Sequence, residues 1–256
     1  MRAIGAIIAA LLLTIAQAGE IAHDQRRSGY SFMAPDTKAM QDDDTSNPGM
    51  LWVLDGEALW TKRIGAADKA CADCHGDAAA SMKGVAARYP AFDKALGRPV
   101  DLEQRINLCR TEHQQAPPLD YEGHDLLALT ALIAHQSRGM PIAPADDPQL
   151  EPFLAEGRAL FMQRQGQLNL ACTNCHDDNW DKHLAGSAIT QGQPTGYPMY
   201  RLEWQTLGSL QRRLRGCMTG IRAQAFSYGA PELVELELYL RSRAAGMPVE
   251  TPAVRP

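Results

Sequence analysis

Two Cys-x-x-Cys-His segments carry the clearest chemistry in this 256-residue sequence, at residues 71–75 and 172–176. Thiols three residues apart share one face of a helix, so both can add to the vinyl groups of a single haem while the adjacent histidine binds the iron. A redox-active dithiol or a zinc site could explain one such segment, but two copies favour haem. We therefore expect two covalently bound haem c groups, with these attachment residues and proximal ligands: Cys71, Cys74, His75, Cys172, Cys175 and His176.

An internal repeat contains both motifs. In each copy a glycine precedes the first motif cysteine by fifteen residues, and a Tyr-Pro pair begins twenty residues before a later, lone cysteine. Both copies end in Gly-Met-Pro, at residues 139–141 and 246–248. Equal spacing of this kind indicates one domain present twice. The matching residues are Gly56 and Gly157, Tyr89 and Tyr197, and Cys109 and Cys217.

Each copy is predicted to contain an opening helix, the haem motif, a loop, a short helix and a closing helix. The closing helices are expected at residues 123–137 and 231–243, where apolar residues recur at spacings of three and four and so form one apolar face. This order resembles class I cytochrome c domains, which implies an all-α fold whose apolar core is filled largely by the porphyrin. We expect two such domains in tandem, residues 51–148 and 149–256, with a linker at residues 141–149.

The first eighteen residues are typical of a secretory signal peptide. Arg2 supplies the positive charge, residues 3–15 are mainly apolar, and a small-x-small cleavage site ends at Ala18. The apolar run is too short to span a bilayer alone, although an uncleaved anchor is the alternative. We expect export to the periplasm, cleavage after Ala18 and no membrane attachment afterwards. Residues 19–50 are polar and are predicted to form an extension that wraps the surface or docks a partner.

The overall charge argues against two classes of partner. The full chain has a formal net charge of −5, and removal of residues 1–18 with Arg2 leaves 24 basic and 30 acidic side chains, a charge of −6. A chain with this acidic balance is not expected to bind nucleic acid or an anionic membrane surface. A local basic pocket is still compatible with it.

The two cysteines outside the motifs occupy equivalent positions, each between a haem motif and a closing helix. In class I cytochromes c this region supplies the distal iron ligand. We therefore predict His/Cys ligation of both haems, with Cys109 opposite His75 and Cys217 opposite His176. A bound iron deprotonates the thiol, and the thiolate charge lowers the reduction potential by stabilising Fe(III).

Two alternatives for these cysteines stay open at this point. A disulfide between Cys109 and Cys217 would require their Cα atoms to lie within about 7 Å, which is unusual for equivalent sites that each face their own haem. Methionine could also be the distal ligand. Met140 and Met247 come late for that role, and Met218 has no counterpart in the first copy.

The sequence resembles the SoxA family, the dihaem subunits of the SoxAX cytochromes of bacterial thiosulfate oxidation. The resemblance covers essentially the whole mature chain and is most specific in the arginine-rich segment 213–222, which contains Cys217. It implies an L-cysteine S-thiosulfotransferase that joins thiosulfate to a cysteine of the SoxYZ carrier and passes two electrons to haem, with SoxX as partner subunit. It further implies that Cys217 is both iron ligand and catalytic residue, able to carry a persulfide, and that Arg213 binds substrate.

The residues around Cys217 suit a dianionic substrate such as thiosulfate. Four arginines lie within five residues of this cysteine, and on a helix the one four residues before it projects to the same side. Guanidinium groups bind oxyanions through a planar fork. An alternative is that such an arginine is structural, because Arg105 stands four residues before Cys109 in the first copy. The four arginines are Arg212, Arg213, Arg215 and Arg222.

Three other functions remain possible for a dihaem cytochrome of this kind. An electron-transfer protein without catalysis would need no reactive sulfur at Cys217. A dihaem peroxidase would need an iron with an open or releasable sixth position, which two cysteine ligands disfavour. A haem-based sulfide sensor would exchange ligands at one haem without turnover.

Overall fold

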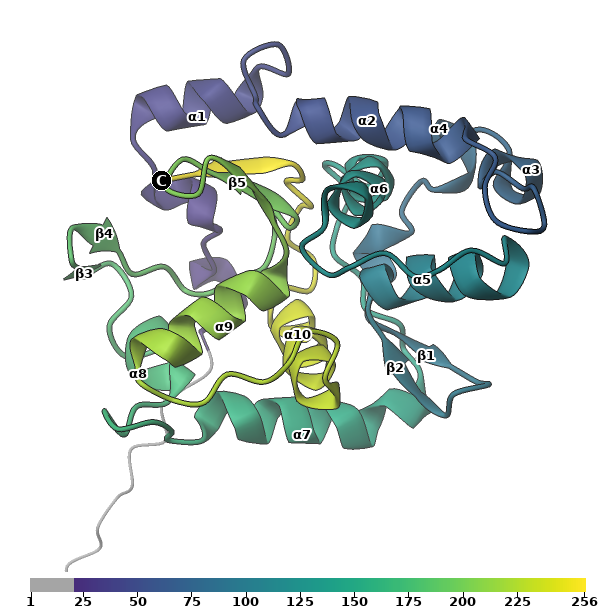
Figure 1. The fold of residues 1–256 in the computed structure, drawn as a ribbon. Helices are drawn as coiled ribbons and strands as arrows, with labels where there is room; N and C mark the ends of the chain where they lie inside the picture. Colours follow the sequence, from purple (N-terminus) through teal and green to yellow (C-terminus); the bar gives the residue numbers. More distant parts are fainter. Residues whose placement is uncertain (1–20) are drawn as a thin grey trace, which may run out of the picture.

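The computed structural model describes residues 21–256 (Figure 1). The predicted signal peptide, residues 1–18, lies outside the described residues, so the structure does not test it. Within residues 21–256 no helix is both long and apolar enough to cross a bilayer. The chain begins with two 3₁₀ turns and a short helix: η1 (His23–Gln25), η2 (Gly29–Phe32) and α1 (Pro35–Asp42).

The first repeat folds around the pair formed by its opening and closing helices. The opening helix α2 covers Met50–Thr61, and the closing helix α6 covers His124–His135. The closing helix is thus slightly shorter than predicted. The elements between them are α3 (Ala72–His75), α4 (Ala78–Ser81), η3 (Ala86–Arg88), β1 (Ala91–Asp93), β2 (Arg98–Val100) and α5 (Leu102–His113).

The second repeat contains counterparts of α2, α3, α5 and α6 in the same order. Its opening helix α7 covers Glu151–Met162, and its closing helix α10 covers Pro231–Arg243, with proline at the first helical position as expected. The remaining elements are η4 (Pro148–Leu150), α8 (Cys172–His176), β3 (His183–Leu184), β4 (Ser187–Ala188), β5 (Met199–Arg201), β6 (Thr206–Gly208), α9 (Leu210–Gly220) and β7 (Ala253–Arg255).

Small sheets accompany the helices, so the expected all-α fold is corrected to a mainly helical one. Within the described residues β1 pairs with β2, β3 pairs with β4, and β5 lies between β6 and β7. The strand β7 comes from the end of the chain and runs parallel to β5. These strands contain only two or three residues, too few for the alternation of apolar and polar residues that indicates a strand in a sequence.

A glycine in each opening helix allows the closing helix to cross it closely. A Cβ atom at Gly56 would lie 2.4 Å from the carbonyl oxygen of Ala128, in α6. A Cβ atom at Gly157 would lie 2.0 Å from the carbonyl oxygen of Glu235, in α10. Both distances are far below van der Waals contact, which explains why the repeat places glycine at this position in both copies.

Replacement of Gly157 by alanine is therefore expected to destabilise the protein by about 2–3 kcal/mol, because α7 and α10 must move apart and lose packing. Gly216→Ala is the matched control, since a Cβ atom at that helical position meets no heavy atom within 4 Å. The control should leave stability unchanged or raise it by up to about 1 kcal/mol. Denaturant unfolding of the haem-loaded variants measures both effects. Equal unfolding midpoints for the two variants would contradict this account of the helix crossing.

The closing helices are buried on more sides than a single apolar face predicts. Every residue of α6 from Leu126 to Ala134 is buried. In α10 the side chain of Arg241 is buried and donates to carbonyl oxygens of the first repeat, at 2.7 Å from Ala86 and 3.3 Å from Tyr89. The two closing helices thus lie at the centre of the molecule, where each contacts parts of both repeats, and their polar residues serve the contact between repeats.

Equivalent residues of the two repeats meet each other across this contact. The backbone N–H of Gly139 donates to Val249 at 2.8 Å, and the equivalent N–H of Gly246 donates to Ile142 at 2.7 Å. The rings of Tyr121 and Tyr228, also equivalent, stack with centroids 5.9 Å apart. The repeated Gly-Met-Pro segments therefore pair with one another and join the two halves.

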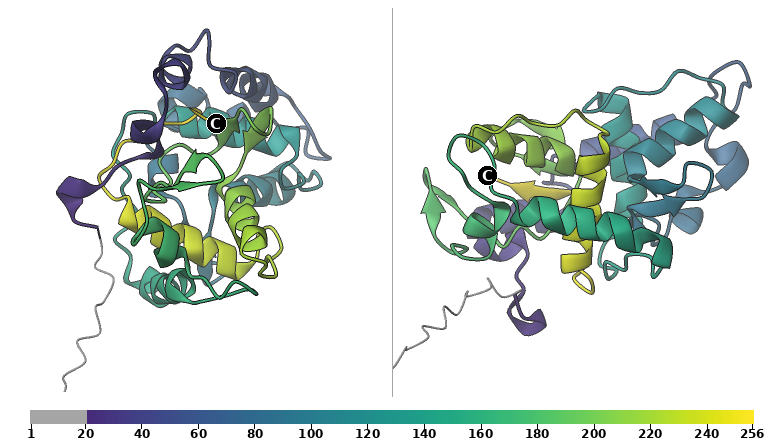
Figure 2. Two further views of the ribbon diagram at one scale, coloured as in Figure 1. Left: turned by 90° about the vertical axis from the view of Figure 1, so that its left-hand side faces the viewer. Right: turned by 90° about the horizontal axis from the view of Figure 1, so that it is seen from below.

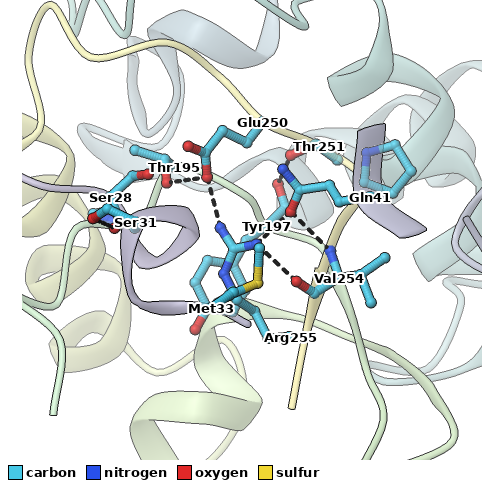
Figure 3. Close-up of polar contacts among 12 residues, drawn as sticks. Ser28, Ser31, Met33, Gln41, Thr195, Tyr197, Glu250, Thr251, Val254 and Arg255 are labelled. Atoms are coloured by element: carbon cyan, nitrogen blue, oxygen red, sulfur yellow. Dashed lines mark hydrogen bonds and ion pairs between the residues drawn. The ribbon is translucent and has the colours of Figure 1, made fainter. Parts of the chain in front are cut away.

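The N-terminal extension packs against the C-terminal strand (Figure 2). Figure 3 shows the polar contacts that hold these segments together. The side-chain oxygen of Gln41, in α1, accepts hydrogen bonds from the backbone N–H of Val254, at 3.1 Å, and from Arg255. Arg255 also pairs with Glu250 at 2.6 Å. Because β7 lies beside β5, the extension supports the hairpin that precedes α9.

Candidate functional site

The second haem motif lies on α8, and its histidine is oriented by a neighbouring loop. The Nδ1 atom of His176 lies 2.7 Å from the carbonyl oxygen of Thr190. A carbonyl oxygen only accepts, so Nδ1 carries the hydrogen and Nε2 keeps its lone pair for a metal. The next residue, Gln191, is fully buried and accepts a hydrogen bond from the backbone N–H of Arg27 at 2.6 Å. The N-terminal extension therefore helps to fix this histidine.

Cys217 faces the same site from helix α9. Burial raises the pKa of its thiol, but a hydrogen bond with His176 and the positive charges of Arg213 and Arg201 outweigh burial, so the pKa lies below its usual value. The site thus favours the thiolate, which is both the nucleophilic and the metal-binding form of cysteine. Sequence reasoning named Cys217, His176 and Arg213, and the structure brings all three together.

The two motif thiols of the second site differ from Cys217 in charge state. Burial and the neighbouring Cys217 raise the pKa of Cys172 to about 11, and the same causes raise the pKa of Cys175. Of these three cysteines, Cys217 is thus the one whose surroundings lower the thiol pKa.

The first haem motif opens onto an apolar cavity of about 460 Å³. Cys71, Cys74 and His75 lie along its wall, Cys109 enters it from α5, and apolar side chains of α6 complete the lining. A cavity of this size and character, with two thiols and a histidine converging on it, fits a covalently attached haem. The structure thus places Cys109 in the cavity of its own motif, as the repeat predicts.

The structure argues against the disulfide alternative. All six cysteines, which lie within the described residues, are free thiols. The charge of Cys109 acts on Cys71, and the charge of Cys217 acts on Cys172, so each lone cysteine lies beside its own motif. The methionines of the Gly-Met-Pro segments lie at the junction of the two repeats, and Met140 is not part of the lining of the first cavity.

The four arginines near Cys217 in the sequence do not all face its side chain. The guanidinium group of Arg212 stacks on Trp204 at 4.2 Å from the ring centroid, and that of Arg215 stacks on Tyr228 at 4.4 Å. Arg213 lies one helical turn before Cys217, is exposed, and makes no ion pair with any residue of the described chain. Of the four arginines, Arg213 is the one whose charge lowers the pKa of Cys217.

In the first repeat the equivalent arginine is paired. Arg105 forms an ion pair with Asp93, at the end of β1, and the Asp93 side chain is largely buried. Arg213 has no such carboxylate partner within the described chain. Sequence reasoning missed Thr190 and Arg201, the second of which could have been found by comparing the two repeats residue by residue.

A family model described as "SoxA/TsdA, cytochrome c domain" matches this chain twice, at residues 55–142 and 156–249. The chain belongs to the SoxA family. The L-cysteine S-thiosulfotransferase subunit SoxA of Rhodovulum sulfidophilum is 42% identical over 232 residues, covering 91% of this chain and 81% of that protein. The SoxA subunit of Pseudaminobacter salicylatoxidans is 40% identical, covering 91% and 82%.

A solved relative has the same fold. The crystal structure of SoxXA from P. pantotrophus matches with a TM-score of 0.87 and 33% identity, covering 90% of this chain and 87% of that chain. The sequence-based expectation of a SoxA-like protein is thus confirmed. As a SoxA family member, the chain is a dihaem c-type cytochrome of the L-cysteine S-thiosulfotransferase class, with one cytochrome c domain in each repeat.

Proposed function

We propose that this SoxA-type cytochrome joins thiosulfate to a cysteine of the SoxYZ carrier, with Cys217 as the catalytic residue and Arg213 as a substrate-binding residue. One observation carries the proposal. The second site directs a histidine, an unpaired arginine and a cysteine of lowered pKa at one point, whereas the first site neutralises its arginine with Asp93. Among the described residues, the arginine one helical turn before the lone cysteine is without an ion pair in the second site and is paired in the first.

Each haem would be held by residues of its own repeat. Cys71 and Cys74 would attach the first, and His75 and Cys109 would be the ligands of its iron. In the second, Cys172 and Cys175 would attach the porphyrin, and the iron ligands would be His176 and Cys217. When bound, the haem supplies a one-electron redox centre and a metal that keeps the cysteine deprotonated.

The proposed reaction is an oxidation, and it balances when two electrons pass to an acceptor. A sulfur–sulfur bond forms between the terminal sulfur of thiosulfate and the carrier cysteine, whose S–H bond breaks. One proton and two electrons are released. Since each haem iron accepts a single electron, a second acceptor must take part, and we propose the haem of a SoxX subunit. The solved relative, a SoxXA complex, supports this choice of partner.

The arginines near Cys217 are the residues whose positive charge can attract the substrate. The substrate is a dianion, while the chain carries a net charge of −5, so the attraction must be local. A charge pair at 4 Å contributes about 4 kcal/mol at an effective dielectric near 20. The exposed guanidinium of Arg213 would provide part of such an interaction, hold the sulfonate end and leave the terminal sulfur directed at Cys217.

We further propose that residues 1–18 are removed, that the mature chain works in the periplasm, and that the domain boundaries follow the repeat, at residues 51–148 and 149–256. The intact mass of the purified chain tests several of these points together. The proposal predicts a mature chain that begins after Ala18 and carries the mass of two haems. A preparation with additional sulfur on Cys217 should show the mass of one more sulfur atom. A chain with fewer than two haems would contradict the ligand assignments.

A further inference from the structure

The two repeats can be compared without a gap around their lone cysteines. From Tyr89 to Cys109 and from Tyr197 to Cys217 every position has one counterpart. The structure bears out this correspondence, since both segments contain a short antiparallel hairpin followed by a helix with a side-chain N-cap. Differences between the two copies therefore report what distinguishes the two sites.

One difference reverses a charge beside the site. In the first repeat the hairpin strand β1 ends at Asp93, whose carboxylate pairs with Arg105 and also accepts backbone N–H groups of the turn. In the second repeat the same strand position, at the end of β5, is Arg201. Arg213 thus faces a second arginine where Arg105 faces an aspartate.

Two positive groups therefore converge on Cys217. The side chain of Arg201 is 11% exposed; its Nε donates to the carbonyl oxygen of Pro256 at 2.8 Å, and one amino group pairs with the exposed Glu203 at 2.8 Å. Its other amino group makes no hydrogen bond within the described chain. Burial, and then the nearby charge of Arg213, lower the pKa of Arg201.

We propose that Arg201 is a second substrate-binding residue, which together with Arg213 holds a dianionic sulfur oxyanion beside Cys217. The two arginines have one exposed carboxylate, that of Glu203, beside them, and an anion of charge −2 between them would compensate the charge that remains. The planar forks of two guanidinium groups can also fix the orientation of a sulfonate. This inference rests on the proposed function and adds to it the residue that distinguishes the second site from the first.

Four variants of the haem-loaded complex test the proposal: Arg201→Gln, Arg201→Lys, Arg201→Asp and the control Arg215→Gln. The control removes the same charge from a residue two positions before Cys217, hence on the other side of α9, where it stacks on Tyr228. The measurements are kcat/KM for thiosulfate with carrier and partner, its dependence on ionic strength, and thiosulfate binding by calorimetry without carrier.

Arg201→Gln should lower kcat/KM about tenfold to hundredfold, mainly through KM, and weaken the dependence on salt. Arg201→Lys should recover part of that loss. Arg201→Asp should be the most severe, because a carboxylate there would pair with Arg213 as Asp93 pairs with Arg105. Adding Arg213→Ala to Arg201→Asp should then cause little further loss.

Two outcomes would overturn the inference. If the Arg201 variants bind thiosulfate as tightly as the Arg215→Gln control, while Arg213→Ala is impaired, Arg201 has no role in binding and only this inference fails. If they alter the haem absorption spectrum but not thiosulfate binding, Arg201 serves the porphyrin instead. If Arg213→Ala and Cys217→Ala also retain full activity, the proposed function itself is wrong.

Discussion

Replacement of Cys217 by alanine is expected to abolish thiosulfate conjugation, by about a thousandfold or more, while both haems stay covalently attached. The thioether bonds at Cys172 and Cys175 do not depend on Cys217, so the haem content should be unchanged. The reaction, however, loses the one thiol whose pKa the site lowers. Conjugation is measured as the mass gained by the carrier cysteine in the presence of thiosulfate and the partner subunit.

Two further variants separate iron ligation from catalysis. Cys217→Met can still provide a sulfur ligand to the iron but has no thiolate, so it should keep a six-coordinate spectrum and lose activity. Cys109→Ala changes the equivalent residue of the first repeat and should alter the spectrum of the first haem with no more than a few-fold loss of activity. Full activity in Cys217→Ala or Cys217→Met would refute the catalytic assignment.

Arg213→Ala is expected to lower kcat/KM for thiosulfate by about tenfold to hundredfold, because the variant loses a charge-assisted contact to a dianion. The effect should shrink as ionic strength rises, since salt screens an exposed charge. Steady-state kinetics at two salt concentrations measure both features.

Arg105→Ala provides the matched control for this prediction. It removes the arginine at the same position of the first repeat, where the side chain is paired with Asp93. The control should leave the KM for thiosulfate unchanged, although it leaves Asp93 without its partner and lowers stability. Equal kcat/KM values for the wild type and Arg213→Ala would return Arg213 to a structural role.

Much of the fold could be predicted because the haem motifs and the repeat constrain it strongly. The closing helix of the second repeat was predicted at residues 231–243 and lies there, with Pro231 at its start. The family followed from the arginine-rich segment around Cys217. Motifs and helix periodicity are local features, so they can be recognised in a single sequence.

The contacts between the repeats could not be predicted in the same way. Gly-Met-Pro was recognised as a repeated end signal, but its pairing with its own counterpart depends on how two domains face each other. Likewise Arg241 and Arg243, at the end of α10, are charged residues whose burial was not predicted. Arg243 in fact pairs with Asp177, the residue after His176, at 2.6 Å. Helix periodicity describes one helix and its face, not a second domain that covers the other face.

The residues of the candidate site can likewise be divided into those that the sequence reveals and those that only the structure reveals. Residues within a motif or at a fixed offset from it were found, as with Cys217 and Arg213. Thr190 was not found, because a backbone carbonyl leaves no signal in the identity of its residue. Arg201 was not found because it lies sixteen residues before Cys217, on a strand too short to recognise. Arg201 can be recognised as a candidate only after the structure of the first repeat shows that Asp93, at the equivalent position, pairs with Arg105.

The central claim is that iron, and not another sulfur atom, binds the thiol of Cys217 opposite His176. An electron-density map of the haem-loaded protein with its partner, at a resolution that separates the iron from its ligands, tests this claim directly. We predict continuous density from the second iron to Sγ of Cys217 on one side and to Nε2 of His176 on the other. Density that joins Cys217 to Cys109, or a methionine sulfur at the second iron, would contradict it.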